Sequence, residues 1–125
     1  MNPILVINDD ASLLSEMVKV LKDGGYAHLA ASSGEQALTL ADGYDFSLVI
    51  LDLKLGDMDG DVLYEKLLKK EEHYVLPVVA LIDGLDGEEV EVLNKLTPQG
   101  AVTLLSKPPK KEWLEDLFKK HTNKV

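Results

Sequence analysis

The sequence predicts an α/β fold with a doubly wound, five-stranded parallel sheet, and three observations support this prediction. Five short apolar segments alternate along the chain with five segments whose apolar residues recur at helical spacing. Parallel strands need crossover connections, which are right-handed and place helices on both faces of the sheet. The chain has 125 residues and is 46% hydrophobic, which is enough for one core, so residues 1–125 are expected to form a single domain.

The first strand and helix are predicted from a change in apolar spacing. Ile4–Ile7 is a short β-branched run that ends at Asn8, which suits a strand buried on both faces. From Ala11 the apolar residues follow the spacing of an amphipathic helix, and the two glycines at 24–25 provide its end. The apolar positions of this helix are Leu13, Leu14, Met17, Val18 and Leu21.

The second and third strands are predicted over Tyr26–Ala31 and Phe46–Leu51. Between them, Ser33 to Gln36 has the spacing of a capping box, so a short helix is expected to follow. Phe46–Leu51 is the most apolar strand and is therefore expected at the centre of the sheet. The helix after it is indicated by Val62, Leu63, Leu67 and Leu68.

The last two strands are predicted over Pro77–Ile82 and Gly100–Leu105. An acidic helix lies between them, and its inward residues are expected to be Val90, Leu93 and Leu96. The two prolines at 108–109 lead into a last helix, because proline is favoured at a first helical position. The apolar face of that helix is expected to contain Trp113, Leu114, Leu117 and Phe118.

Composition excludes several classes of function. The formal charge is −9, which argues against direct nucleic acid binding, because that needs clustered basic residues. There is no cysteine, so disulfides, thiol nucleophiles and thiolate metal sites are excluded. No apolar run approaches the roughly 18 residues of a membrane span, and the N-terminus lacks the pattern of a signal peptide. We therefore expect a cytoplasmic protein without membrane contact.

Polar residues follow three of the predicted strands, where ligands bind in folds of this class. Asn8, Asp9 and Asp10 end the first strand, Asp52 ends the third, and Lys107 ends the fifth. Carboxylates about 4 Å apart repel by ~4 kcal/mol at an effective dielectric constant of about 20, so a cation is expected among them. Mg²⁺ suits these hard oxygen ligands. Beside Mg²⁺ and a lysine, Asp52 is the natural nucleophile for a phosphoryl group.

Each of these residues also has a purely structural interpretation. Asp9 or Asp10 is suited to cap the following helix, and Asp52 is suited to begin a turn. Lys107 is harder to explain in this way, because a cation just before a helix start opposes the helix dipole.

Three segments carry a resemblance to a known family. "ILVINDD" (4–10), "LVILDLKLGDMDG" (48–60) and "GAVTLLSKP" (100–108) resemble the signature segments of bacterial response-regulator receiver domains, in the same order along the chain. The resemblance implies a flavodoxin-like (βα)5 fold with strand order 2-1-3-4-5. It also implies a cis peptide bond between Lys107 and Pro108.

The resemblance also implies a role for each site residue. Asp52 matches the phosphoacceptor, Asp9 a Mg²⁺ ligand, and Lys107 the phosphate-binding lysine. Lys54 would offer its backbone carbonyl to the metal, and Asp10 matches an often acidic position that is at most a weaker ligand, through water. The implied partners are a histidine kinase or phosphotransfer protein and a downstream protein. The downstream protein would bind the face made by the fourth helix, fifth strand and last helix.

The sequence departs from the family at the positions that usually switch. Ile82 stands where threonine or serine is usual, and Leu104 where an aromatic residue is usual. Asp83 replaces a usually small residue, so its carboxylate is expected to repel a phosphodonor or to engage the lysine at 107. Asn8 replaces an acid, which predicts weaker metal binding. Ile82 has no donor to offer a phosphoryl oxygen, so an altered or muted switch is expected.

The leading hypothesis is therefore a receiver domain that accepts a phosphoryl group on Asp52 with Mg²⁺ in a two-component phosphorelay. It is not an enzyme in the usual sense, although it would promote its own phosphorylation and dephosphorylation. The alternative is a pseudo-receiver that binds partners independently of phosphorylation. An aspartate-nucleophile phosphatase or a flavodoxin-like redox protein is disfavoured, because the chain has neither a G-x-G-x-x-G motif nor a glycine-rich loop after the first strand.

Overall fold

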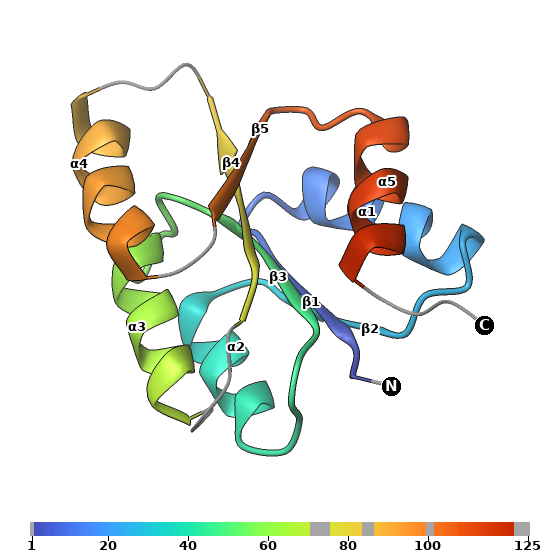
Figure 1. The fold of residues 1–125 in the computed structure, drawn as a ribbon, viewed down its shortest axis with the longest axis horizontal. Helices are drawn as coiled ribbons and strands as arrows, with labels where there is room; N and C mark the ends of the chain where they lie inside the picture. Colours follow the sequence, from blue (N-terminus) through green and yellow to red (C-terminus); the bar gives the residue numbers. More distant parts are fainter. Residues whose placement is uncertain (1, 71–75, 84–86, 100–101, 122–125) are drawn as a thin grey trace.

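The computed structural model describes residues 2–70, 76–83, 87–99 and 102–121, which form a parallel sheet between two layers of helices (Figure 1). The strand order is β2-β1-β3-β4-β5, which confirms the predicted fold class and order. The strands are β1 (Ile4–Ile7), β2 (His28–Ala31), β3 (Leu48–Asp52), β4 (Val78–Ile82) and β5 (Val102–Ser106). The helices are α1 (Ala11–Asp23), α2 (Gly34–Ala41), α3 (Gly60–Lys70), α4 (Gly87–Leu96) and α5 (Lys111–His121), with a 3₁₀ turn over Thr97–Gln99.

The strand bounds differ slightly from the predicted ones. β3 lies at the centre of the sheet, as predicted, but it begins at Leu48. Phe46 is buried just before it, and the Ser47 amide donates to the Pro3 carbonyl at 3.0 Å, which aligns β3 beside β1. The predicted fifth strand began at Gly100, which lies outside the described residues, and the observed strand runs from Val102 to Ser106.

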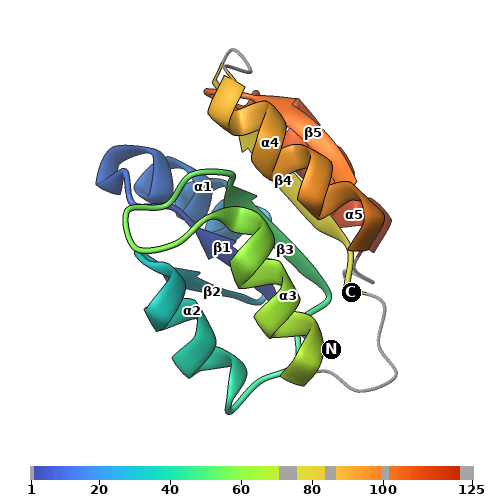
Figure 2. The ribbon, with the colours of Figure 1, turned by 90° about the vertical axis from the view of Figure 1, so that its left-hand side faces the viewer.

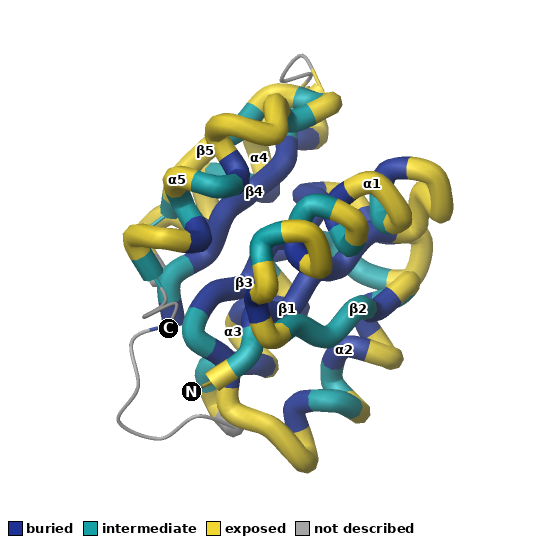
Figure 3. Tube along the Cα trace, turned by 90° about the vertical axis from the view of Figure 1, so that its right-hand side faces the viewer, coloured by how far each residue is buried: buried dark blue, intermediate teal, exposed yellow. Residues whose placement is uncertain are grey.

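Helices cover both faces of the sheet, and each face has its own apolar core (Figure 2). Side chains of α2, α3 and α4 pack against one face and those of α1 and α5 against the other. β1 and β3 are buried along their whole length, whereas β5 is an edge strand with several exposed residues (Figure 3). Because β1 and β3 are buried, the polar residues at their carboxyl ends, Asn8 and Asp52, are buried as well.

The first helix forms where the sequence predicts it. Asp10 caps its N-terminus, and Leu13, Met17 and Leu21 form its buried face. Gly25 adopts a φ of 75°, a left-handed conformation that glycine takes without strain, and so the chain turns away after the helix. Asp10 and Gly25 thus mark the two ends of α1.

In two helices, one residue of the predicted inward face is exposed, whereas the other predicted residues face the core. Val90 of α4 is 40% exposed, and the buried residues of that helix are Glu89, Val92 and Leu96. The prediction was right for Leu96, which is buried, and for Leu93, which packs partly buried against the core. It was wrong for Val90, because the Glu89 carboxylate turns inward instead and accepts a hydrogen bond from the Asp83 amide. On α5, Leu114 and Phe118 are buried and Leu117 packs partly buried against the core, as predicted, but Trp113 is 39% exposed.

Candidate functional site

The carboxyl ends of β1 and β3 bring two polar residues side by side. Ile7 pairs with Leu51, so the next residues, Asn8 and Asp52, lie beside each other at the same edge of the sheet. Both are buried: Asn8 follows the apolar strand β1, and Asp52 is the last residue of β3. Asp52 therefore lies at the carboxyl end of a parallel strand, which is where ligands bind in folds of this class.

Lys107 reaches this edge from β5. Its backbone amide donates to the Ile82 carbonyl at 2.9 Å, which extends the pairing of β4 and β5 by one residue. Its ammonium nitrogen lies 2.6 Å from the Asp52 Oδ2 atom, and the two side chains are 23% and 7% exposed. A charge-assisted hydrogen bond of this length is among the stronger polar contacts in proteins. The Lys107–Pro108 peptide bond is cis, as predicted.

The three polar residues after β1 have different environments. The Asn8 side chain is fully buried, and its Oδ1 accepts from the Asp10 amide at 2.8 Å. Asp10 Oδ1 accepts from the Ser12 and Leu13 amides at 3.0 and 3.2 Å, so this carboxylate caps α1. Its role as a weak metal ligand stays a prediction. Asp9 is exposed and points toward the loop after β3, because its Oδ2 lies 3.4 Å from where a Cβ on Gly56 would be.

The loop after β3 is a tight turn that returns the chain to the sheet. Lys54 and Asp59 form an antiparallel bridge, and the Gly60 amide donates to the Leu53 carbonyl at 2.8 Å. A Cβ on Gly60 would lie 2.9 Å from a Leu51 methyl and 3.1 Å from the Asp52 carbonyl. Glycine is therefore required for this close approach.

A second cation stands at the same edge. The Lys54 ammonium lies 3.1 Å from an Asp59 carboxylate oxygen and 3.5 Å from a Glu88 carboxylate oxygen in the first turn of α4. The hydrogen bond with Asp59, together with the charge of that residue and of Glu88, raises the pKa of Lys54, so this side chain is protonated at neutral pH.

A cavity of about 270 Å³ connects these groups, and it is lined by Asp52, Lys54, Asp83, Glu88, Glu89 and Lys107. Sequence reasoning missed the acidic residues of α4 and the side chain of Lys54, which it considered only for its backbone carbonyl. The available signal was the position of α4 after β4, because helices that follow strands begin over the same edge of the sheet.

The donor set can be tested against the expected Mg²⁺. Within the described ranges, no three acidic or histidine side chains lie close enough together to enclose a metal. Asp9 and Asp52 nevertheless supply carboxylate oxygens at one edge, and the Lys54 backbone carbonyl belongs to the turn beside Asp9. Mg²⁺ usually takes one or two protein carboxylates and completes its shell with water. The residues present therefore fit Mg²⁺ better than a metal that needs a complete set of side-chain ligands.

Comparison with known protein families shows which family this chain matches. The model of the response regulator receiver domain family matches residues 4–119. The chain belongs to this family. The receiver domain is 33% identical over 119 residues to the response regulator protein FleR of Pseudomonas aeruginosa, covering 94% of this chain and 24% of FleR. It is 31% identical over 112 residues to the transcriptional regulatory protein GlrR of Escherichia coli, covering 89% of this chain and 24% of GlrR. The chain thus spans about a quarter of the length of these two curated relatives.

Solved structures show the same fold. The chemotaxis protein CheY4 of Vibrio cholerae superimposes with a TM-score of 0.83 at 23% identity, covering 98% of this chain and 99% of CheY4. The receiver domain of the sensor histidine kinase PA1611 from Pseudomonas aeruginosa superimposes with a TM-score of 0.80 at 21% identity, covering 96% of each chain. That structure holds a magnesium ion in its active site cleft.

Two of the unusual residues of this receiver domain, Ile82 and Asp83, lie at the same edge, whereas Leu104 lies in the middle of β5. Ile82 ends β4 and packs partly buried against the apolar core on the α2, α3 and α4 face. Leu104 lies in β5 and is 40% exposed. The exposed Asp83 lines the same cavity as Lys107, but the Lys107 ammonium forms its ion pair with Asp52. Among the described residues, no helix has the length and apolar character that a bilayer span requires.

Proposed function

We propose that residues 1–125 form one receiver domain that accepts a phosphoryl group on Asp52 in a two-component phosphorelay. The observation that carries this proposal is the contact between Asp52 and Lys107. A largely buried carboxylate at the end of the central strand lies 2.6 Å from an ammonium group, inside a cavity at the ligand-binding edge of the sheet.

The proposed reaction is phosphoryl transfer from a phosphohistidine. An oxygen of the Asp52 carboxylate attacks phosphorus, a new P–O bond forms, and the P–N bond to the imidazole breaks. The imidazole nitrogen keeps the electron pair of that bond and takes a proton from solvent, and Asp52 becomes an acyl phosphate. Lys107 stabilises the charge on the transferred oxygens. Attack of water on phosphorus later releases inorganic phosphate and restores the Asp52 carboxylate.

The proposed metal is Mg²⁺, which would be held by Asp9, Asp52 and the Lys54 backbone carbonyl. The magnesium ion in the cleft of the PA1611 receiver domain supports this assignment by analogy of fold. When bound, Mg²⁺ supplies positive charge against the phosphoryl oxygens. Asn8 contributes a neutral amide where a carboxylate would add charge, so we expect Mg²⁺ to bind more weakly than in a receiver with an acid there.

The proposed partners follow from the family and from the exposed surface. A histidine kinase or phosphotransfer protein would donate the phosphoryl group in the cytoplasm. A downstream protein would bind the face made by α4, β5 and α5. Three large apolar side chains support that choice, because Val90, Leu104 and Trp113 come from these three elements and are 39–40% exposed.

The test is intact mass spectrometry of the full chain after incubation with Mg²⁺ and acetyl phosphate. We expect wild-type protein to gain the mass of one phosphoryl group in a linkage that hydrolyses in strong acid and in base, as expected for an acyl phosphate. Asp52→Asn protein, and wild-type protein with the metal chelated, should gain nothing. Absence of the adduct in the wild-type sample would contradict the proposal and favour a module that binds partners independently of phosphorylation.

A further inference from the structure

The cavity around Asp52 contains more negative than positive side chains. Its lining includes the carboxylates of Asp83, Glu88 and Glu89 besides Asp52, against the ammonium groups of Lys54 and Lys107. Lys107 is already paired with Asp52 at 2.6 Å. A phosphoryl group on Asp52 would add further negative charge to this cavity, so it needs another donor.

The end of β4 cannot supply that donor through its side chain. Ile82, the last residue of β4, is aliphatic and has no hydrogen to donate. The Asp83 amide, which follows it, already donates to the Glu89 carboxylate at 3.2 Å. The remaining cationic side chain on the cavity wall is Lys54.

Within the described part of the chain, the ion pairs of the Lys54 ammonium are exposed and therefore weak. Its ammonium lies 3.1 Å from Asp59 and 3.5 Å from Glu88, and the side chains of all three residues are at least 40% exposed. Exposed ion pairs contribute little to stability, and the flexible lysine stem allows the ammonium to exchange one oxygen partner for another. A doubly charged phosphoryl group is a stronger partner for an ammonium than one exposed carboxylate.

We propose that the Lys54 ammonium binds the phosphoryl group on Asp52 and leaves Glu88 to do so. The proposal rests on phosphorylation of Asp52 and gives that reaction a second cationic residue. It also gives the chain a connection to α4 that does not use the hydroxyl missing at Ile82. The Lys54–Glu88 pair joins the turn after β3 to the first turn of α4 and would open only when the phosphoryl group is present.

The test uses the full chain labelled with ¹⁵N and titrated with beryllofluoride in the presence of Mg²⁺. Beryllofluoride binds noncovalently where the phosphoryl group would, and its affinity is read from the amide signals near Asp52. Lys54→Met keeps the aliphatic stem and the backbone carbonyl but removes the charge. We expect about tenfold weaker binding in Lys54→Met and near wild-type binding in Lys54→Arg. The matched control is Lys69→Met, which removes an exposed lysine paired with Glu65 on α3.

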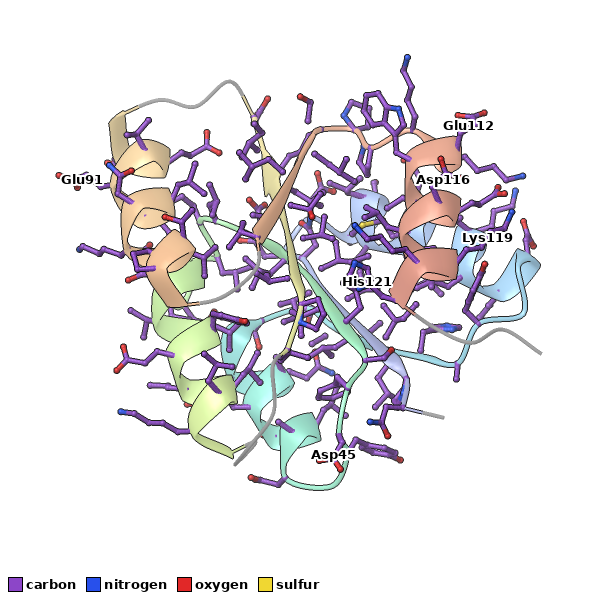
Figure 4. The ribbon with its side chains drawn as sticks, in the orientation of Figure 1. Asp45, Glu91, Glu112, Asp116, Lys119 and His121 are labelled. Carbon is purple, nitrogen blue, oxygen red and sulfur yellow. The ribbon has the colours of Figure 1, made fainter. Side chains whose placement is uncertain are left out.

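A second variant tests the exchange of partners. Glu88→Gln removes the carboxylate that competes for Lys54, so we expect beryllofluoride to bind several-fold more tightly. Because this gain depends on Lys54, it should shrink in the Lys54→Met background. The control is Glu91→Gln, the same change on the outer side of α4, where the side chain points away from the sheet (Figure 4). It should leave the affinity unchanged.

The outcomes separate this inference from the proposed function. If wild-type protein does not bind beryllofluoride at all, phosphorylation of Asp52 is wrong and this inference falls with it. If wild-type and Lys54→Met proteins bind equally, Asp52 remains the phosphoacceptor and only the role of Lys54 is wrong. An equal gain from Glu88→Gln in both backgrounds would also overturn the exchange, because Glu88 would then act by repulsion alone.

Discussion

At the scale of single residues, the contact between Asp52 and Lys107 carries the proposed chemistry, and we expect it to stabilise the fold locally. Lys107→Met leaves a carboxylate that is 7% exposed without its cation. We expect the free energy of unfolding to fall by about 2 kcal/mol, because a charge shielded from water has lost its partner. Urea denaturation at neutral pH measures this loss.

The matched control for Lys107 is Lys111→Met, which breaks the exposed pair with Glu115 on α5. This pair spans 3.7 Å at the surface, so its loss should change the free energy of unfolding by no more than about 0.5 kcal/mol. Equal effects of the two variants would mean that water screens Asp52 as well as it screens Glu115.

At the scale of an element, α2 depends on a residue outside it. Asp57, in the turn after β3, accepts hydrogen bonds from the Gly34 and Glu35 amides at 3.0 and 2.9 Å. These amides hold the pKa of Asp57 below its usual range. The cap therefore stabilises the protein above the unfolded pKa, and this contribution is lost as the pH falls through the lower folded pKa. Asp57→Asn should cost about 0.5–1 kcal/mol at neutral pH, and the difference should close below about pH 4.

Urea denaturation of wild-type and Asp57→Asn proteins at neutral and acid pH measures this difference. The control is Asp45→Asn, which neutralises an exposed carboxylate in the segment before β3 (Figure 4). It should change the free energy of unfolding little at either pH. A cost for Asp57→Asn that stays constant as the pH is lowered would show that the charge of Asp57 does not act through the cap.

The position of α3 depends on one buried hydroxyl. The Tyr64 side chain is fully buried, its hydroxyl donates to the Leu76 carbonyl ahead of β4, and burial raises its pKa. Tyr64→Phe leaves that carbonyl unpaired, so we expect a loss of about 1–2 kcal/mol in the free energy of unfolding. The control is Tyr44→Phe, since Tyr44 is 51% exposed. Thermal and urea denaturation compare the two variants, and equal stabilities would contradict the role of this hydrogen bond.

The same elements show what the sequence can predict. The strand order follows from the resemblance to receiver domains, and the burial of β3 follows from its apolar composition. The structure agrees with both predictions. On α4 the prediction was right for Leu93 and Leu96 but wrong for Val90, because Glu89 is buried in the first turn through a hydrogen bond with the Asp83 amide. Apolar spacing does not register a carboxylate that turns inward to satisfy a backbone group.

At the scale of the whole molecule, the sheet topology gathers the candidate site from distant parts of the chain. Asp52 and Lys107 were predictable, because residues at the carboxyl ends of parallel strands meet at one edge. The pairing of Lys54 with Glu88 was not, since it depends on where two long side chains point after the backbone has folded. Sequence reasoning thus located the edge where Asp52 and Lys107 meet, whereas the charge arrangement around them required the structure.

The last prediction concerns how far a signal from Asp52 travels through the molecule. With Mg²⁺ and beryllofluoride, amide shifts in the wild-type chain should be confined to the cavity and the first turn of α4. Ile82→Thr combined with Leu104→Tyr should extend them to β5 and α5. The threonine hydroxyl at the end of β4 can donate a hydrogen bond to the bound beryllofluoride. The tyrosine ring on β5 can then move toward the space that the threonine side chain has left.

The single variants separate the two parts of this path. Ile82→Thr restores the donor but not the ring, so its additional shifts should end within β4. Leu104→Tyr supplies a ring without a donor, so its shifts should match those of the wild-type chain. If the wild-type protein already shifts throughout β5 and α5, the aliphatic residues at 82 and 104 do not mute the switch. The signal must then cross the sheet by packing changes that need neither a hydroxyl nor an aromatic ring.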